Sequence, residues 1–314
     1  MADLDKKIKM IAVAGPTASG KTSLGIAIAE ALKGEVISCD SMQIYRNMTI
    51  ATAAPTSEET QGIPHHLVGI LDPKEEYSVA QFCKDAGAAV NEVNQRGKLP
   101  VLVGGTGLYM QSFAENLTFS GSNSAEVRAT LQVRLEQEGP EVLLKELFQI
   151  DPEYAAKLHL ADVKRITRAL EIYYSDGITM THQVERSHDN PTPYDTLYIG
   201  ITFADRQKLY DRINRRVDIM VEQGLVQEAE QAYNNRGLTA AQAIGHKELF
   251  DYFDGTATLE ECIERLKMQT RRYAKRQLSW FRRNEQMHWI YADDKPSEET
   301  AREAIEIIKK EWQI

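Results

Sequence analysis

The sequence predicts an α/β fold in which a parallel sheet carries helices on both faces and an all-helical segment interrupts the sheet domain. Apolar runs alternate with helical patterns from Met10 to about Glu115, as expected for repeated strand–helix units. Between residues 124 and 175 only helical patterning is found, and an apolar strand then returns at Leu197–Phe203. We therefore place an α/β core at residues 1–116 and 195–314, and an all-helical insertion at 117–194. A linear chain of two domains is the alternative, but the returning strand favours an insertion.

The elements of the core follow from the spacing of apolar residues. A short, continuous apolar run between turn residues is typical of a buried strand, and apolar side chains three and four residues apart are typical of a helix. The expected elements are a strand at Met10–Ala14, a helix at Ser23–Leu32, strands at Glu35–Ser38 and Leu67–Leu71, a helix at Ser78–Gln95, a strand at Leu99–Val103 and a helix ending near Glu115.

The insertion and the C-terminal part are expected to be mainly helical. In the insertion we expect the polar segment Thr179–Asn190 to be a loop, and helices at Arg128–Glu138, Glu141–Ile150 and Asp162–Ser175. After the returning strand we expect helices at Arg206–Gln223, Leu225–Asn234, Thr239–Asp251 and Leu259–Asn284, an edge strand at Met287–Tyr291, and a last helix at Ser297–Lys310.

Composition excludes several classes of protein. The chain lacks a run of about 18 or more apolar residues, so we expect no membrane span. Cys39, Cys83 and Cys262 are far apart and odd in number, which predicts neither a disulfide framework nor a metal site and fits a reducing cytoplasm. The net charge of −9 weighs against nonspecific coating of nucleic acids, but it leaves room for a local basic surface.

A phosphate-binding motif follows the first strand. The stretch Gly15-Pro16-Thr17-Ala18-Ser19-Gly20-Lys21-Thr22 matches G-x-x-x-x-G-K-[ST], the P-loop pattern. The glycines let the backbone wrap around an anion, Lys21 places a cation on the terminal phosphates, and Thr22 offers a hydroxyl to Mg²⁺. An ordinary glycine-rich turn is the alternative, and it is disfavoured because every motif position is filled. The sequence thus predicts a P-loop NTPase-like core that binds a phosphate or diphosphate group.

The position of the acidic residue distinguishes this chain from P-loop nucleotide hydrolases. In those enzymes a second apolar strand usually ends in an aspartate, whereas Leu99–Val103 ends in Gly104-Gly105-Thr106-Gly107. Asp40 follows the strand at Glu35–Ser38, and the carboxyl ends of parallel strands line the site. Asp40 could assist a metal or accept a proton from a nucleophile, with Ser41 and Gln43 as polar neighbours. The alternative is an aspartate that caps a helix.

Three further segments are basic. The first is a helix with Arg206, Lys208, Arg212, Arg215 and Arg216, most of which a solvated face paired with nearby aspartates would explain. The second, Arg265–Arg283, has eight basic residues and no acid, which favours a polyanion groove. The third, Lys164–Arg168, is explained equally well by a charged surface. His65-His66 lacks a third ligand pattern nearby, so we expect a structural role.

The combination of motifs resembles the bacterial tRNA dimethylallyltransferases (tRNA isopentenyltransferases) over nearly the whole chain. The matching segments, in order, are GPTASGKT, Ser38-Cys39-Asp40-Ser41-Met42-Gln43-Ile44-Tyr45-Arg46, Pro64-His65-His66-Leu67, Gly104-Gly105-Thr106-Gly107-Leu108-Tyr109, Lys164-Arg165-Ile166-Thr167-Arg168-Ala169-Leu170-Glu171, Ala243-Ile244-Gly245-His246-Lys247-Glu248 and Lys275-Arg276-Gln277-Leu278-Ser279-Trp280-Phe281.

The resemblance implies a reaction and a set of site residues. A dimethylallyl group would pass from dimethylallyl diphosphate to N6 of the adenosine 3′ of the anticodon, with Mg²⁺, in a cytoplasmic enzyme that we expect to be a monomer. The P-loop would hold the diphosphate, with Thr17 near the leaving oxygen, Asp40 as the base and Arg212 on the pyrophosphate. The residues that would contact the tRNA are Asp40, Ser41, Met42, Gln43, Lys164, Arg165, Ile166, Thr167 and Arg168. From charge and patterning we further expect the insertion, together with Arg271, Arg272, Lys275 and Arg276, to contact the anticodon stem-loop.

The chain departs from the family pattern at several positions, and two other functions stay open. Where the family usually has Gly, Asp, Gly and Lys after Tyr45-Arg46, and Tyr after Gly245, this chain has Asn47, Thr49, Ala51, Ala54 and His246. The main alternative is a P-loop small-molecule kinase, nucleoside or shikimate-like, in which Asp40 deprotonates a hydroxyl and Arg165 or Arg168 belongs to a lid. The other is a nucleotide-gated RNA-binding module without catalysis.

Overall fold

The computed structural model describes residues 7–119, 124–235 and 239–314, and its contacts divide the chain into two compact units. The first unit combines residues up to Ala114 with Pro193–Ile314, and the second is Glu115–Thr192. Each unit has its own hydrophobic cluster or clusters. Among the described residues, no helix is both long and apolar enough to cross a membrane.

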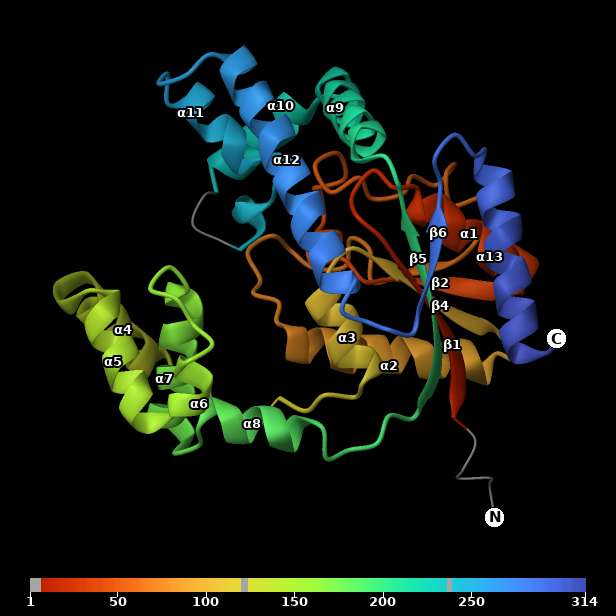
Figure 1. The fold of residues 1–314 in the computed structure, drawn as a ribbon. Helices are drawn as coiled ribbons and strands as arrows, with labels where there is room; N and C mark the ends of the chain where they lie inside the picture. The colour runs from red at the N-terminus through yellow and green to blue at the C-terminus, as the bar shows by residue number, and fades with distance from the viewer. Residues whose placement is uncertain (1–6, 120–123, 236–238) are drawn as a thin grey trace. The chain divides into compact units, whose positions relative to one another are not determined.

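The first unit is built on a six-stranded sheet whose strands are all parallel (Figure 1). The strand order is β3-β2-β4-β1-β5-β6, with β1 at Ile8–Ala14, β2 at Gly34–Ser38, β3 at His65–His66, β4 at Leu99–Gly104, β5 at Tyr194–Thr202 and β6 at Met287–Tyr291. Since every pair is parallel, the carboxyl ends of the strands meet at one edge of the sheet, and the loops that follow them form the site.

Helices cover both faces of this sheet, as the sequence predicts. Alternate residues of β1 point to opposite faces: Ile11 and Val13 pack with α1 (Lys21–Ala31) and α13 (Ser297–Trp312). Met10, Ala12 and Ala14 belong to the other cluster, which includes residues of α2 (Val79–Gln95) and α3 (Gly107–Ala114). Both faces of the central strand are therefore buried, which is why it reads as a continuous apolar run.

A helical layer follows β5 and overlies the carboxyl edge of the sheet. It contains α9 (Arg206–Glu222), α10 (Leu225–Tyr233), α11 (Phe250–Phe253) and α12 (Leu259–Phe281). The predicted helix at Thr239–Asp251 is wrong. The described residues form 3₁₀ turns at Ala240–Gln242 and Lys247–Leu249, and Gly245 between them has a φ of 113°, which a helix cannot contain. The helix expected to reach Asn284 ends at Phe281.

The second unit is all-helical. It consists of α4 (Ala125–Glu138), α5 (Pro140–Ile150), α6 (Pro152–Ala155), α7 (Val163–Asp176) and α8 (Met180–Ser187), around a core that includes Leu131, Leu143, Leu147 and Leu170. The prediction of a loop at Thr179–Asn190 is wrong, because Thr179 caps α8. The buried carboxylate of Asp151 caps α6 and accepts hydrogen bonds from the backbone and hydroxyl of Thr181, which fixes the start of α8.

The edge of the sheet next to β2 also differs from the prediction. The strand expected at Leu67–Leu71 is absent from the described structure; β3 is His65–His66, and Leu71 makes one isolated bridge with Tyr45. Leu67 has a φ of 62°, which interrupts an extended strand. The imidazole of His66 lies 2.8 Å from the carboxylate of Glu35, so this histidine ties the edge strand to β2.

Candidate active site

The P-loop leaves the carboxyl end of β1 and leads into α1. A Cβ on Gly15 would lie 2.7 Å from the carbonyl oxygen of Ile201, so only glycine allows this close approach to β5. Ala18 and Gly20 have φ values of 63° and 96°, which wrap the backbone before α1 begins at Lys21. The first N–H groups of a helix have no partner within it and attract anions. The loop therefore presents an anion-binding helix end at the edge of the sheet.

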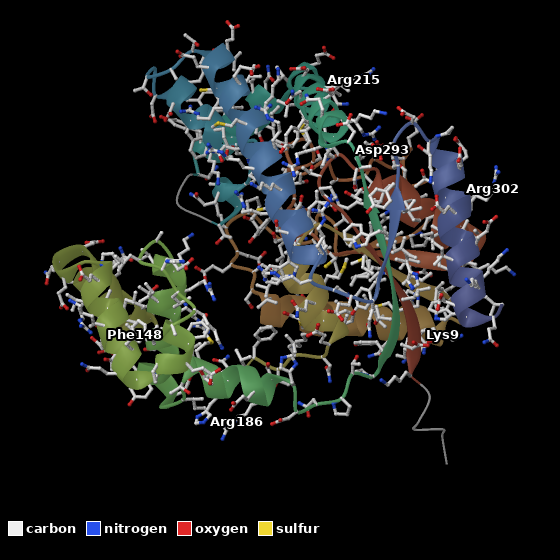
Figure 2. All side chains as sticks on the ribbon, viewed as in Figure 1. Lys9, Phe148, Arg186, Arg215, Asp293 and Arg302 are labelled. Atoms are coloured by element: carbon white, nitrogen blue, oxygen red, sulfur yellow. The ribbon has the colours of Figure 1, made fainter. Side chains whose placement is uncertain are left out.

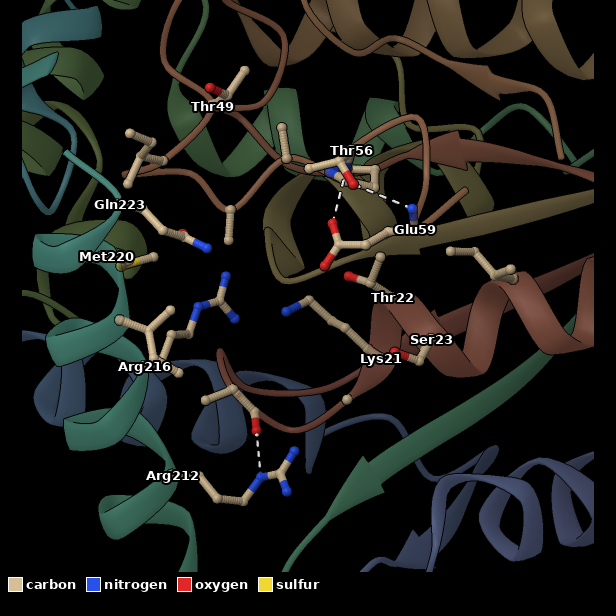
Figure 3. Close-up of a pocket in the computed structure, with 18 of the residues that line it drawn as sticks. Lys21, Thr22, Ser23, Thr49, Thr56, Glu59, Arg212, Arg216, Met220 and Gln223 are labelled. Atoms are coloured by element: carbon tan, nitrogen blue, oxygen red, sulfur yellow. Dashed lines mark hydrogen bonds between the residues drawn. The ribbon is translucent and has the colours of Figure 1, made fainter. Parts of the chain in front are cut away.

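Two cavities open at this helix end, and both are lined by Lys21, Thr22 and Arg216. The first has a volume of about 810 Å³ and includes Arg212 and Arg215 of α9. Figure 3 shows the side chains of Lys21 and Arg216 pointing toward one another across it. Arg215, labelled in Figure 2, is exposed on α9. The shared residues make the two cavities parts of one site.

The second cavity holds the polar groups that could take part in proton transfer. It has a volume of about 290 Å³ and is lined by Thr17 from the P-loop, Asp40 from the end of β2, and Tyr273 and Arg276 from α12. Burial, followed by the charge of Asp40, raises the pKa of Tyr273, so this phenol stays protonated at neutral pH. A cation-rich cavity thus adjoins a smaller one that contains a carboxylate.

The electrostatics of the site favour an anion. Burial, followed by the nearby guanidinium of Arg216, lowers the pKa of Lys21 to about 8, although the carboxylate of Asp40 acts in the opposite direction. The pKa of Arg216 is itself lowered, mainly by burial. Arg212 donates from Nε to the carbonyl oxygen of Ala18 at 2.9 Å, and its guanidinium lies over the ring of Phe203. The positive charges of these side chains lie close together and exceed the negative charge of the nearby carboxylates. A bound phosphate group would balance this excess.

Asp40 lies where the sequence predicts it, and it does not cap a helix. Its Oδ1 accepts a hydrogen bond from the backbone N–H of Met42 at 2.9 Å, which forms a turn. Because the described residues after Asp40 form turns, the helix-capping alternative is wrong. The side chain is partly exposed in the second cavity, and its charge acts on Lys21, Arg216 and Tyr273. Asp40 is therefore a carboxylate beside the phosphate-binding loop.

The neighbours of Asp40 are partly engaged by the protein. Ser41 donates its backbone N–H to the hydroxyl of Thr106, which fixes the turn. Gln43 accepts a hydrogen bond from Ser38 and donates to the carbonyl oxygens of Thr52 and Ala53. The amide of Gln43 is thus used to hold the loop at residues 48–54, the hydroxyl of Ser41 accepts a hydrogen bond from that of Thr106, and Met42 packs against the core.

Long-range contacts alter the interpretation of the basic helix α12. Arg265 pairs with Asp251, and Lys267 pairs with Asp218 and Glu264, so the prediction that all eight basic residues lack acidic neighbours is wrong for these two. Arg271 is hydrogen-bonded to Asn214. The exposed residues without an ion pair in the described ranges are Arg272, Lys275, Arg276, Arg282 and Arg283.

The basic stretch Lys164–Arg168 lies on α7 of the second unit. The side chain of Ile166 is buried in the core of that unit, so it is not available to a ligand. Arg168 pairs with Glu171 at 3.0 Å, and Arg165 lies over the ring of Tyr154. Lys164 and Arg165 are exposed, and the structure leaves them as the accessible part of this stretch.

The loop that departs from the family pattern is held by a residue that the sequence does not single out. Glu228 of α10 is buried and accepts the backbone N–H groups of Ile50 and Ala51 at 2.8 and 2.9 Å. The imidazole of His246 lies 2.8 Å from the same carboxylate. His246 thus takes part in anchoring a loop that lines both cavities. No local motif could reveal Glu228, because its partners are distant in sequence.

The residues around the P-loop could hold a metal only together with a ligand. In the parts of the chain described here, no group of three or more His, Cys, Asp or Glu side chains could bind a metal by itself. The hydroxyl of Thr22 faces the same cavities as Lys21 and Arg216. Mg²⁺ is commonly held by few protein oxygens together with substrate phosphates and water, and this site fits that arrangement.

Comparisons with known proteins agree on one family. The family model described as IPP transferase matches residues 43–284, and the one described as isopentenyl transferase matches residues 8–68. The chain is 45% identical to the tRNA dimethylallyltransferase of Bacillus cytotoxicus over 98% of this chain and 96% of that protein. It is 44% identical to the tRNA dimethylallyltransferase of Caldanaerobacter subterraneus over 95% of this chain and 96% of that protein.

Solved structures give the same result. The crystal structure of the full-length tRNA isopentenylpyrophosphate transferase from Bacillus halodurans aligns with a TM-score of 0.73 and 43% identity, covering 97% of this chain and 96% of that chain. A eukaryotic dimethylallyltransferase acting on tRNA aligns with a TM-score of 0.81 and 31% identity, covering 96% of this chain and 80% of that chain.

The lowered pKa of Lys21 predicts how anion binding depends on pH. Lys21 is cationic below its pKa and neutral above it, so the affinity for inorganic pyrophosphate should fall above about pH 8, by up to about tenfold per pH unit. The Lys21→Arg variant stays charged, so it should lose much less affinity between pH 7 and 9. Titration calorimetry of both proteins measures this, and an equal loss in both would assign the pH dependence to another group.

Proposed function

The chain belongs to the tRNA dimethylallyltransferase family, and we propose that it transfers a dimethylallyl group from dimethylallyl diphosphate to N6 of the adenosine 3′-adjacent to the anticodon. The observation that carries this proposal is the pairing of a cation-rich P-loop cavity with a neighbouring cavity that contains the carboxylate of Asp40. The first cavity suits a leaving diphosphate, and the second suits an acceptor that must lose a proton.

The donor would bind with its diphosphate on the P-loop. The N–H groups at the start of α1, the ammonium of Lys21 and the guanidinium groups of Arg212 and Arg216 would neutralise it. These groups stabilise the negative charge that develops when the allylic C–O bond breaks, which is where electrostatic catalysis acts. Thr17 would lie near the breaking bond, since it lines the cavity shared with Asp40. We propose that the loop binds a leaving group rather than a nucleotide.

We also propose a Mg²⁺ ion at this position, held by the hydroxyl of Thr22 together with diphosphate oxygens and water. A divalent cation supplies further neutralisation of the leaving diphosphate. The residues of the chain supply the remaining functions: they position the donor, exclude water and accept the proton. The protein would need no aspartate at the end of β4 for this, because no water molecule has to be aligned for hydrolysis.

The acceptor would lose its proton to Asp40. The lone pair of an adenine N6 amine is delocalised into the ring, so forming the new C–N bond requires loss of an N–H proton. In the balanced step, N6 bonds to the allylic carbon, the C–O electrons leave with diphosphate, and the proton passes to the carboxylate of Asp40. The adenine must leave its stack to reach this cavity, as in other enzymes that act on bases.

We propose that tRNA binds through two basic surfaces. One is the basic surface formed by Arg272, Lys275 and Arg276 of α12 and by Arg282 and Arg283 just after its end. The other belongs to the helical insertion, with Lys164 and Arg165 exposed on α7, and it would grip the anticodon arm. We further propose that the protein works as a monomer in the cytoplasm. A small-molecule kinase is not favoured, because the relatives that match the whole chain are tRNA dimethylallyltransferases.

Label transfer tests the proposed donor, and one substitution tests the proposed base. Wild-type protein mixed with bulk tRNA should move label from labelled dimethylallyl diphosphate into RNA, and it should move none from labelled ATP. Asp40→Asn keeps the size of the side chain and removes the base, so single-turnover transfer should fall by about 10²–10⁴-fold. Binding of tRNA should change much less. Near-normal transfer by a folded Asp40→Asn protein would contradict the assignment of the base.

Salt dependence tests the proposed tRNA surface on α12. Replacing Arg272, Lys275 and Arg276 with glutamine should flatten the log–log dependence of tRNA affinity on salt, by at most about 0.7–0.9 for each lost phosphate contact. Lys267→Gln on the same helix is the control, because Lys267 is paired with Asp218 and Glu264 and should leave the slope unchanged. If the triple variant keeps the wild-type slope, α12 does not contact the phosphates of the tRNA.

A further inference from the structure

One face of α12 docks on the glycine-rich loop after β4. Gln277 and Trp280 lie about one turn apart on this face. A Cβ on Gly107 would lie 2.3 Å from Cδ1 of Trp280, and a Cβ on Gly105 would lie 2.2 Å from Nε2 of Gln277. A side chain at either glycine would therefore displace Gln277 or Trp280. The helix that carries the exposed basic residues is therefore pressed directly against the backbone of the site.

Gln277 joins this loop to the P-loop. Its side chain is buried, with only 5% exposed. The carbonyl oxygen Oε1 accepts the backbone N–H of Thr17 at 2.8 Å, and Nε2 donates to the carbonyl oxygen of Gly105 at 2.9 Å. An amide of this length is needed, because a carboxylate cannot donate to Gly105 and an asparagine is one methylene shorter.

The hydrogen bond to Thr17 has a consequence for the P-loop. The backbone N–H of Thr17 points at Gln277, so it is not available to the diphosphate. The anion must then be held by the N–H groups that follow, at the start of α1. Fixing the peptide of Thr17 also constrains the direction of its side chain, which lines the same cavity as Asp40. The geometry of the donor site therefore depends on a residue of α12.

We propose that Gln277 is a positioning residue that sets the P-loop through the backbone of Thr17 and connects the donor site to the basic helix α12. It acts on the diphosphate through Thr17, and its side chain also borders the cavity that contains Thr17 and Asp40. This inference rests on the proposed function only in calling the anion a leaving diphosphate. Loss of Gln277 should therefore weaken the binding of the diphosphate and leave the binding of tRNA intact. The reason is that the exposed basic residues lie elsewhere on the helix.

The experiment compares two substitutions at Gln277 with one control, and it uses inorganic pyrophosphate as the probe. Gln277→Met is close in shape and removes the hydrogen bonds to Thr17 and Gly105, as well as the one to Tyr273. The dissociation constant for pyrophosphate should therefore rise about tenfold or more, whereas tRNA affinity stays within about twofold. Gln269→Met makes the same exchange two turns earlier on α12, at a residue that lines neither cavity, and should change neither constant.

Gln277→Glu gives a readout that a merely structural role would not produce. At pH 7.5 the introduced carboxylate repels the carbonyl oxygen of Gly105, so pyrophosphate binding should be weak. Burial raises the pKa of a carboxyl group, and its protonated form can donate and accept like the native amide. Pyrophosphate affinity relative to wild type should therefore recover as the pH falls toward 5.5. If Gln277→Met does not fold, the pH dependence of Gln277→Glu alone tests the proposed role of Gln277.

Two results would overturn the proposal: wild-type pyrophosphate affinity in a folded Gln277→Met protein, or a deficit in Gln277→Glu that does not change with pH. Pyrophosphate binding needs neither tRNA nor group transfer. If wild-type protein failed to transfer the label while the Gln277 variants behaved as expected, the proposed function would be wrong and the role of Gln277 would stand.

Discussion

The site depends on one electrostatic constraint, the crowding of Lys21 and Arg216 at the start of α1. Burial is the main reason that the pKa of both groups is lowered, and the charge of a neighbouring cation adds to it, Arg216 for Lys21 and Arg212 for Arg216. The carboxylates of Asp40 and Glu59 offset only part of this charge. An unpaired cation in a partly buried site is costly unless a ligand supplies the opposite charge. The arrangement is therefore stable chiefly with a polyanion bound, as a diphosphate leaving group would be.

Lys21 and Arg216 can lie this close because the strands and loops around them approach one another closely at glycines. A Cβ on Gly104 would lie 1.9 Å from the carbonyl oxygen of Cys39, and a Cβ on Gly15 would lie 2.7 Å from that of Ile201. These glycines bring the carboxyl ends of β1, β2, β4 and β5 so near that the loops after them share one site. The contacts of α12 with Gly105 and Gly107 extend the same principle to the helical layer. Replacing Gly15 or Gly104 would push backbone apart, and replacing Gly105 or Gly107 would displace Gln277 or Trp280.

The sequence predicts the features that are encoded locally. The P-loop, Asp40 and the buried strands can be read from spacing and composition, because a motif or an apolar run lies within a few residues. The features it fails to predict depend on distant partners or on unusual backbone angles. Gly245 breaks an otherwise helical pattern, Thr179 starts a helix that reads as a polar loop, and Lys267 finds acids on another helix. Gln277 and Glu228 act across 260 and 178 residues of sequence, so no local pattern reveals them.

The central claim is that the P-loop holds the diphosphate of the donor while its allylic carbon faces Asp40. A crystal structure with a thiodiphosphate analogue of dimethylallyl diphosphate, in which sulfur replaces the bridging oxygen, measures this directly. The account predicts that the phosphate oxygens contact the N–H groups at the start of α1 and the ammonium of Lys21, with the allylic carbon in the cavity lined by Thr17, Asp40 and Tyr273. A diphosphate bound away from the P-loop, or an allylic chain directed away from Asp40, would contradict it.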